Sequence, residues 1–142
     1  MRGRHPIARL VAACFRFPPE TAACPVSITK TATESGETWI RRFGSHELRS
    51  TLRFGRLPGT FLETFGLFTF EVPLVEESGE IQLPVQRGWA LGMPIPKLLL
   101  PISVSTEAEF DGRFTFDVSL TAPLGVGLIV RYRGWLQPEP TR

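Results

Sequence analysis

Between residues 26 and 136, apolar side chains recur at every second position, and this alternation constrains the fold more than any other feature. The clearest example is the segment 46–54, where Leu48, Leu52 and Phe54 share one side and charged residues occupy the other. Successive side chains of a β-strand point to opposite faces of the sheet. The pattern therefore predicts a series of β-strands, each with one apolar face.

Turn residues separate these alternating runs. The chain has 13 glycines and 13 prolines spread along its length, which favours many turns over long helices. Asp111-Gly112 is the strongest signal, because this dipeptide between alternating runs is typical of a hairpin. The run 80–89 reads as one strand, although Pro84 restricts it to a sheet edge or a bulge.

The segment 6–16 has a different period. Its apolar residues fall at helical spacing and are Ile7, Leu10, Val11, Cys14 and Phe15. Pro6 suits the first turn of a helix, and the two prolines at 18 and 19 end it. A short N-terminal helix is therefore predicted.

Together these elements predict a mainly β fold: an antiparallel meander that forms a barrel or a curled half-barrel, with a short N-terminal helix. A two-sheet sandwich is the alternative. The 142 residues suffice for one domain with its own core. We expect a single domain over residues 1–142, with its core at about 6–137.

Charge and cysteine usage exclude several classes of protein. Sixteen basic and fourteen acidic residues are too balanced to argue for binding to nucleic acid or to an anionic membrane. No stretch approaches the roughly 20 apolar residues that span a membrane. Cys14 and Cys24 form no metal-binding spacing, and no phosphate loop or dinucleotide fingerprint occurs, so neither metal nor cofactor is predicted. Reduced thiols in a cytoplasmic protein are the simpler interpretation, and a disulfide is the alternative.

The candidate site comes from three ionisable residues that each lie between bulky apolar residues on one strand face. The triplets are Trp39, Arg41 and Phe43; Phe61, Glu63 and Phe65; and Val85, Arg87 and Trp89. A charge in such surroundings is costly unless it is paired or binds a ligand.

Two interpretations of these triplets remain open. In the functional one, Arg41 and Arg87 project into the cavity of a curved sheet and hold an anionic group, while Glu63 orients one guanidinium. Trp39 and Trp89 then cover the apolar part of the ligand. In the structural one, which we favour, a buried Arg–Glu pair fixes the register of the sheet, or arginines at strand ends extend to water.

The segment 91–101, LGMPIPKLLLP, contains three prolines and breaks the strand pattern. Its residues Met93, Ile95 and Leu98 are candidates for a lid over a barrel mouth, or for a hydrophobic plug, which we prefer. The nearest approach to catalytic groups is Ser45-His46-Glu47, whose neighbouring side chains alternate faces and cannot form a triad. The sequence therefore favours a protein that is not an enzyme.

Several motifs in a fixed order carry a family resemblance. They are ETWIRRFG at 37–44, Phe65-Gly66 preceded by Glu63, GMPIP at 92–96, DGRFTFDV at 111–118 and YRGWLQP at 132–138. Over residues 3–138 the chain resembles the bacterial family called domain of unknown function 4166. The resemblance implies a domain with no assigned activity. It occurs alone or at the C-terminal end of larger proteins that resemble saccharopine dehydrogenase-type reductases.

Two functions follow as hypotheses. The first is a non-catalytic module that binds a small amphipathic anion, such as a lipid or acyl acid, in an apolar β-barrel pocket. The alternative is an interaction or accessory domain that packs on a partner enzyme such as a saccharopine-dehydrogenase-like reductase.

Overall fold

The computed structural model describes residues 1–20 and 23–138. It contains the helix α1 (Pro6–Cys14), the 3-10 turn η1 (Lys97–Leu99) and the strands β1 (Val26–Thr33), β2 (Gly36–Phe43), β3 (His46–Phe54), β4 (Thr60–Phe65), β5 (Phe68–Pro73), β6 (Val75–Glu77), β7 (Glu80–Gln82), β8 (Arg87–Ala90), β9 (Met93–Pro94), β10 (Ile102–Phe110), β11 (Arg113–Ala122) and β12 (Gly127–Leu136). The mainly β prediction with a short N-terminal helix is confirmed.

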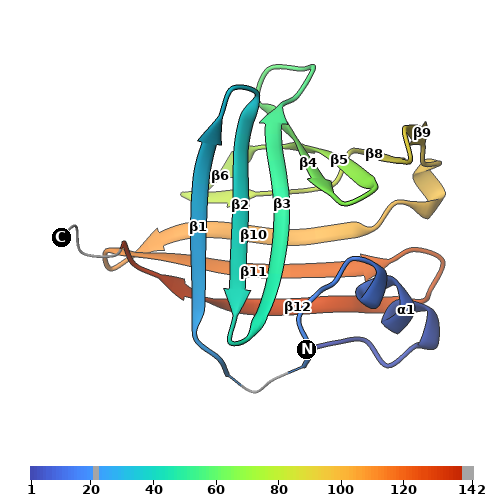
Figure 1. The fold of residues 1–142 in the computed structure, drawn as a ribbon, viewed down its shortest axis with the longest axis horizontal. Helices are drawn as coiled ribbons and strands as arrows, with labels where there is room; N and C mark the ends of the chain where they lie inside the picture. The colour runs from blue at the N-terminus through green and yellow to red at the C-terminus, as the bar shows by residue number, and fades with distance from the viewer. Residues whose placement is uncertain (21–22, 139–142) are drawn as a thin grey trace.

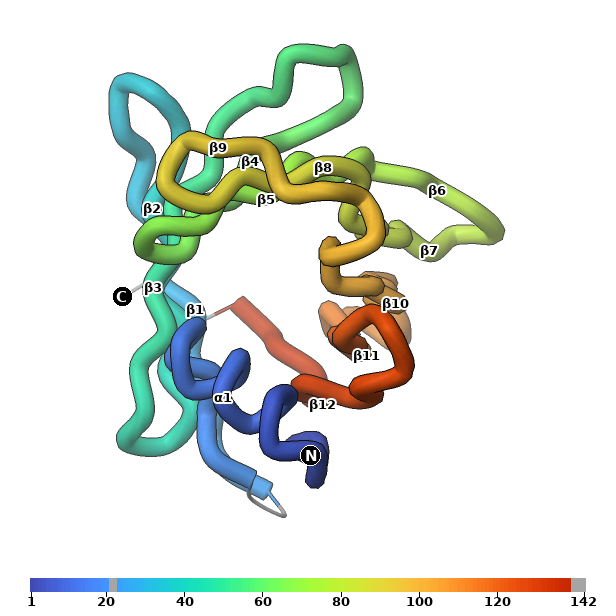
Figure 2. Tube along the Cα trace, turned by 90° about the vertical axis from the view of Figure 1, so that its right-hand side faces the viewer, coloured from blue at the N-terminus to red at the C-terminus, as the bar shows by residue number. Residues whose placement is uncertain are grey.

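The strands form two antiparallel sheets, with β1 to β3 running across β10 to β12 (Figure 1). The first sheet has the order β1-β2-β3-β4-β5-β8-β9, and the second has the order β12-β11-β10-β7-β6. Figure 2 shows both sheets curling around a shared interior, with α1 at one side between β1 and β12. The two sheets do not join into one closed barrel. The meander is also interrupted, because β6 and β7 pair in the second sheet before β8 returns to the first.

The return crossing lies at residues 83–86. The Leu83 N–H donates to the Ser105 carbonyl of the second sheet at 3.0 Å, and the Gln86 N–H donates to the Glu71 carbonyl of the first sheet at 3.0 Å. Pro84 lies between these two bonds and has no N–H to donate. The single strand predicted for 80–89 is therefore wrong, because its two halves, β7 and β8, belong to different sheets.

Helix α1 packs closely on β12 through its smallest side chains. Its first turn is capped by the His5 Nδ1 atom, which accepts from the Ile7 N–H at 3.3 Å. Ala8 and Ala12 are fully buried, and their small size allows the helix to approach the strand. The helix ends at Cys14, two residues earlier than predicted, and Arg16 already has a positive φ of 56°.

The free edge of β12 is covered by the residues before α1. Arg2 forms a β-bridge with Val130, and the Gly3 N–H donates to the Ile129 carbonyl at 3.2 Å. A Cβ atom at Gly3 would lie 1.6 Å from the Leu128 carbonyl oxygen, so this approach requires glycine. The added strand pairing protects an edge that would otherwise offer unpaired backbone groups.

One hydrophobic cluster joins the helix to both sheets. Its buried members are Ala12, Phe17, Phe43, Leu48, Ala122, Ile129 and Val130. The alternation of β3 holds near this cluster and fails at the far end of the strand, where Phe54 is 91% exposed. The Asp111-Gly112 hairpin is confirmed: Phe110 pairs with Arg113, and both turn residues have positive φ, as a type I′ turn requires.

Cys14 and Cys24 are both free thiols. No helix among the described residues is long and apolar enough to cross a membrane.

Candidate functional site

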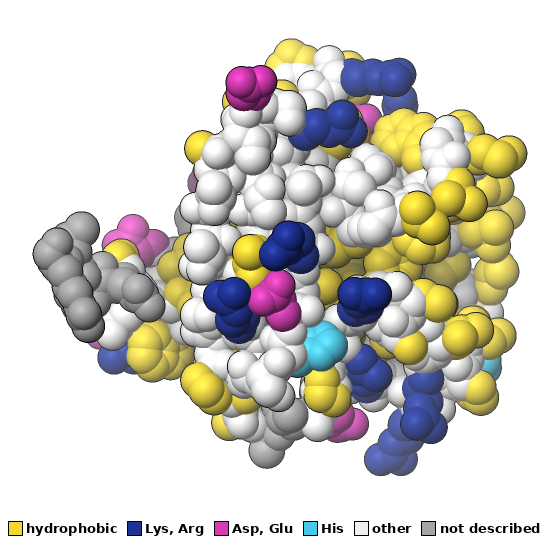
Figure 3. Space-filling model, in the orientation of Figure 1, with side chains coloured by type: hydrophobic (Ala, Val, Ile, Leu, Met, Phe, Trp, Pro, Cys, Tyr) yellow, Lys and Arg dark blue, Asp and Glu magenta, His cyan; other side chains and the backbone are white. Residues whose placement is uncertain are grey.

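The space between the two sheets is a cavity of about 1170 Å³. Pockets that hold small molecules usually measure about 300–1,000 Å³, so the volume suffices for one. Apolar side chains make up most of its walls. Figure 3 shows a hollow with hydrophobic side chains around it, between α1 and the end of the first sheet that carries β8 and β9.

Phenylalanines from both sheets line the cavity. They are Phe43, Phe61, Phe65, Phe68, Phe70, Phe114 and Phe116. Four of the five residues of the apolar stripe predicted for the N-terminal helix line the same space: Leu10, Val11, Cys14 and Phe15. The fifth, Ile7, is exposed and does not line it. The Phe15 ring lies 4.5 Å from the Phe68 ring, centroid to centroid, so the helix closes one end of the aromatic wall.

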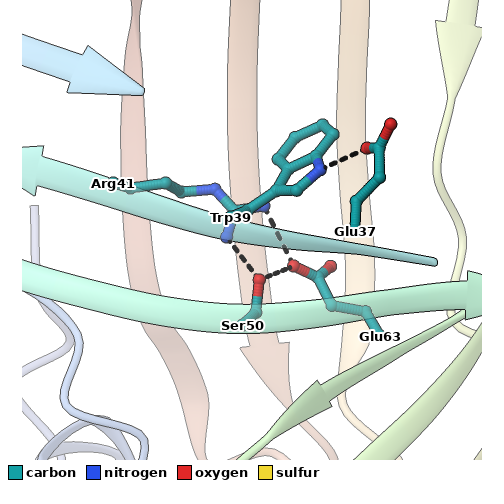
Figure 4. Close-up of polar contacts among 5 residues, drawn as sticks. All are labelled: Glu37, Trp39, Arg41, Ser50 and Glu63. Carbon is teal, nitrogen blue, oxygen red and sulfur yellow. Dashed lines mark hydrogen bonds and ion pairs between the residues drawn. The ribbon is translucent and has the colours of Figure 1, made fainter. Parts of the chain in front are cut away.

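A polar cluster interrupts the aromatic wall of the first sheet (Figure 4). Arg41 on β2 donates through Nη1 to Ser50 Oγ at 2.8 Å and through Nη2 to Glu63 Oε1 at 2.9 Å. Ser50 on β3 donates to the same Glu63 oxygen at 2.6 Å. The side chains of Arg41 and Glu63 are 13% and 15% exposed. The two residues singled out by strand periodicity on β2 and β4 thus form an ion pair at the cavity wall.

Trp39 extends the cluster toward β1. The Lys30 ammonium lies 3.8 Å from the centre of the Trp39 ring, and the Arg41 guanidinium lies 4.9 Å from it. The Trp39 indole N–H donates to Glu37 at 2.7 Å, which holds the ring in place (Figure 4). Lys30 lines the cavity and forms no ion pair with any described residue.

The second sheet contributes a polar stripe on β10. Ser103, Ser105 and Glu107 line the cavity, whereas Ile102 and Val104 are 55% and 68% exposed on the other face. Burial raises the pKa of the Glu107 carboxyl above its usual value of 4.5. The positive charges of Lys30 and Arg41 oppose this rise and the negative charge of Glu63 adds to it, so Glu107 interacts electrostatically with the cluster of the first sheet.

Tyr132 on β12 adds a phenol to the same interior. Its ring packs edge-on against Phe43 at 5.3 Å and Phe116 at 6.1 Å, measured between centroids. Burial raises the pKa of the Tyr132 hydroxyl to about 12. The hydroxyl therefore keeps its proton at neutral pH and can donate a hydrogen bond to a ligand.

Arg87 and Trp89 do not line the cavity, so the inward orientation predicted for them is wrong. Arg87 is exposed and pairs in register with Glu71. Between them on β8, Gly88 lies against the cavity wall, where an added Cβ would meet Leu100 at 2.8 Å and Phe70 at 3.0 Å. The crossing at 83–86 changes the phase of the alternation, so that Val85 lines the cavity and residues 87 and 89 do not.

The segment 91–101 contributes fewer side chains to the cavity wall than a lid or a plug would require. Ile95 lines the cavity, together with Leu99 of η1. Met93 and Leu98 are 72% and 75% exposed and do not line it. The three predicted residues therefore separate into one wall residue and two surface residues.

The chain matches the family model "Domain of unknown function (DUF4166)" over residues 1–136. The chain belongs to the DUF4166 family. Comparison with curated proteins and with solved structures gave no match. The matched part of this DUF4166 chain runs from the residues before α1 to the end of β12, so it contains both sheets and all the cavity residues discussed above.

Sequence periodicity missed Lys30, Glu107 and Tyr132, which line the cavity of this DUF4166 chain, and Ser50, which lies behind its wall. Lys30 was detectable, because in the alternating pattern it shares a strand face with the apolar residues Ile28 and Ala32. Tyr132 and the buried Ser50 carry no comparable signal. Glu107 was hidden, because the apolar residues of β10 occupy the opposite face and mark the wrong side as the interior.

Proposed function

We propose that this DUF4166 domain binds a small amphipathic anion, such as a lipid or acyl acid, in the cavity between its sheets, without transforming it. One observation carries the proposal. A large cavity with mainly aromatic and aliphatic walls contains one charged cluster, Lys30, Arg41, Glu63 and Glu107, to which both sheets contribute. Such a division of polar and apolar walls suits a ligand with a charged head and an apolar tail.

The charge balance of the cluster favours an anion. Glu63 neutralises Arg41, while Lys30 forms no ion pair with a described residue. The raised pKa of Glu107 favours its neutral form. Lys30 is thus the cation left to hold the carboxylate or phosphate of a ligand.

The geometry of the cations suits a charged head group. Lys30 is a flexible point charge with three donors, and the Arg41 guanidinium keeps N–H groups beyond the two that already donate to Ser50 and Glu63. The ring of Trp39 lies against both cations and orients them. The apolar tail would then lie along the phenylalanines toward α1.

Binding without catalysis is proposed because Ser50, whose hydroxyl donates to Glu63, is poorly placed as a nucleophile. Ser50 is 2% exposed, does not line the cavity and already accepts from Arg41 while donating to Glu63. A nucleophile needs a path to its substrate and a base free to take its proton. Ser50 therefore acts in holding the ion pair.

Calorimetric titration of the protein with hexadecanoate tests the proposal, with the neutral hexadecanol as a second ligand. We expect one hexadecanoate site, with an affinity about tenfold or more above that of hexadecanol, because hydrogen bonds to a charged group are worth about 1.5–3 kcal/mol. Lys30→Met should lose that preference. Lys97→Met, which changes the other lysine of the chain outside this cavity, should keep it.

The proposal fails if hexadecanoate does not bind, or if acid and alcohol bind the wild type equally well. Native mass spectrometry of protein purified from its own host gives a second reading. A co-purifying acidic amphiphile of small mass supports the proposal.

A role as an accessory domain on a reductase-like partner enzyme stays a prediction. The observation that favours it is the set of exposed apolar residues at the α1 end of the molecule. A protein partner that purifies with the chain in fixed proportion would support it. The cytoplasmic location likewise stays a prediction.

A further inference from the structure

Exposed apolar side chains gather at one end of the molecule. Six of them are between 64% and 75% exposed: Leu10, Leu67, Leu91, Met93, Leu98 and Leu124. We call these six residues the apolar rim. Scattered exposed leucines are ordinary, but a contiguous group marks a surface that contacts something other than water.

The rim residues come from four segments at the same end of the molecule (Figure 1). These are α1, the turn from β4 to β5, the stretch from β8 to η1, and the turn from β11 to β12. The Leu91 N–H donates to the Leu67 carbonyl at 2.9 Å, which joins two of these segments. Figure 3 shows hydrophobic side chains along this whole side of the molecule, next to the hollow.

The charges near the rim are of one sign. Residues 1–19, 66–67, 91–101 and 123–126 contain no aspartate or glutamate. They carry four exposed cations: Arg4, Arg9, Arg16 and Lys97. The turn between β10 and β11, at the opposite end of the molecule in Figure 1, contains the acidic Asp111. The net charge of +2 over the whole chain does not show this asymmetry.

From these observations we propose that the apolar rim docks on an anionic lipid bilayer. Exposed apolar side chains beside cations are the combination by which proteins adsorb to such surfaces: the apolar groups enter the interface and the cations pair with acidic headgroups. The cations favour an anionic bilayer over a second copy of the chain as the binding partner, because a rim-to-rim dimer would bring the cations of both copies together.

Docking also orients the cavity. Leu10 belongs both to the rim and to the cavity wall, and Ile95, Leu99 and Pro123 of the same segments line the cavity. The apolar end of the cavity therefore opens beside the proposed membrane contact. If the cavity holds an acyl acid, a step that rests on the proposed function, the ligand passes between bilayer and cavity with little exposure to water.

Sedimentation with vesicles tests the docking. The wild-type protein is mixed with vesicles of phosphatidylcholine that contain about 30% phosphatidylserine, or with pure phosphatidylcholine vesicles, at about 0.1 M salt. We expect binding to the anionic vesicles about tenfold or more stronger than to the neutral ones. Equal binding to both, or binding to neither, would overturn the proposal.

Two pairs of substitutions separate the rim from the rest of the surface. Leu98→Glu with Leu124→Glu places charges on two rim residues that are 75% and 73% exposed, so the fold should tolerate them. We expect a loss of vesicle binding of about tenfold or more. Phe54→Glu with Phe110→Glu is the matched control, since these residues are 91% and 75% exposed and lie outside the rim. It should retain binding within about threefold. The same loss in both pairs would overturn the proposal.

Removal of the cations tests the electrostatic part. Arg9→Gln with Lys97→Gln should weaken binding to the anionic vesicles about 25-fold, because each cation near a charged surface contributes about fivefold. Arg53→Gln with Arg56→Gln, on and just after β3, should change it by less than about threefold. Binding that is insensitive to the first pair contradicts docking to anionic lipid.

The remaining outcomes identify other occupants. A dimer in analytical ultracentrifugation that the rim substitutions abolish, without vesicle binding, would assign the rim to a second copy and overturn the proposal. A stoichiometric protein partner lost with the same substitutions, without vesicle binding, would also overturn it. Ligand binding in the cavity is tested separately from vesicle binding. Lys30→Met should lose the preference for hexadecanoate over hexadecanol and should still bind vesicles. Leu98→Glu with Leu124→Glu should still bind hexadecanoate in solution without vesicles.

Discussion

Arg41 and Glu63 meet at 2.9 Å although a whole strand, β3, separates the strands that carry them. Ser50 on that intervening strand accepts from one partner and donates to the other. The three side chains therefore tie three neighbouring strands into one register, because a slip by one residue would turn any of them to the other face. The ion pair thus has a structural role and still presents Arg41 to the cavity.

Substitution of Glu63 separates these two roles. Glu63→Gln leaves the Arg41 charge without its partner in a largely buried place, and we expect the free energy of unfolding to fall by about 2 kcal/mol. The same change frees Arg41, so hexadecanoate should bind more tightly. Urea unfolding and calorimetric titration measure the two effects. Weaker hexadecanoate binding by Glu63→Gln would contradict the anion site.

A matched double substitution checks the cause of the lost stability. Arg41→Met combined with Glu63→Met removes both charges and keeps apolar volume at the cavity wall. We expect it to be more stable than Glu63→Gln alone, since a lone buried charge costs more than a missing pair. The preference for hexadecanoate over hexadecanol should fall without disappearing, because Lys30 remains in the cavity.

The raised pKa of Glu107 makes stability depend on pH. Below the pKa of the unfolded chain, both states hold the proton and burial carries no charge penalty. As pH rises through the higher native pKa, the native carboxyl ionises in a desolvated place, so the wild type loses stability. Relative to Glu107→Gln, we expect the wild type to lose stability as pH rises from about 4, the pKa range of an unperturbed glutamate, as followed by urea midpoints. Glu109→Gln, an exposed neighbour on β10, should parallel the wild type.

The sequence predicts the cavity wall correctly only for strands whose apolar side is the side that faces the cavity. On β11, the alternating apolar residues are Phe114, Phe116, Val118 and Leu120, and all four line the cavity. On β10 the rule fails, because Ser103 and Ser105 face inward while Val104 faces outward. Periodicity identifies the two faces of a strand, but it assumes an apolar interior, and a polar site inside the cavity reverses that assumption.

The wrong orientation predicted for Arg87 and Trp89 has a topological cause. The alternation of Val85, Arg87 and Trp89 holds only within one continuous strand. Here the chain changes sheets at residues 83–86, and no local pattern except Pro84 marks the crossing. The pairing of β6 and β7 with the second sheet depends on contacts between residues far apart in sequence, which a single sequence does not display.

Glu71, which lies away from the proposed site, tests how much a buried polar atom without a partner lowers the free energy of unfolding. Its side chain is 1% exposed, and its Oε1 atom has no hydrogen-bond partner among the described residues. A buried polar atom without a partner destabilises a fold by about 1–3 kcal/mol. Glu71→Met has a similar volume and no such atom, so we expect a gain of about 1 kcal/mol or more in the free energy of unfolding. Glu80→Gln on exposed β7 should change little, and a loss of stability in Glu71→Met would show that the carboxylate has a partner.

Tyr132 is the single tyrosine of the chain, so the absorbance of its phenolate reports on the cavity directly. Burial raises its pKa to about 12, two units above the ordinary value of 10.0. The unfolded chain ionises first, so the contribution of Tyr132 to stability is constant below about pH 10 and falls as pH rises from there toward the native pKa. We expect phenolate absorbance of the native protein to appear together with alkaline unfolding, and Tyr132→Phe to show neither the absorbance change nor this part of the stability loss. Ionisation near pH 10 in a protein that is still folded would place the hydroxyl in water, and would argue against a cavity dry enough to hold an acyl chain.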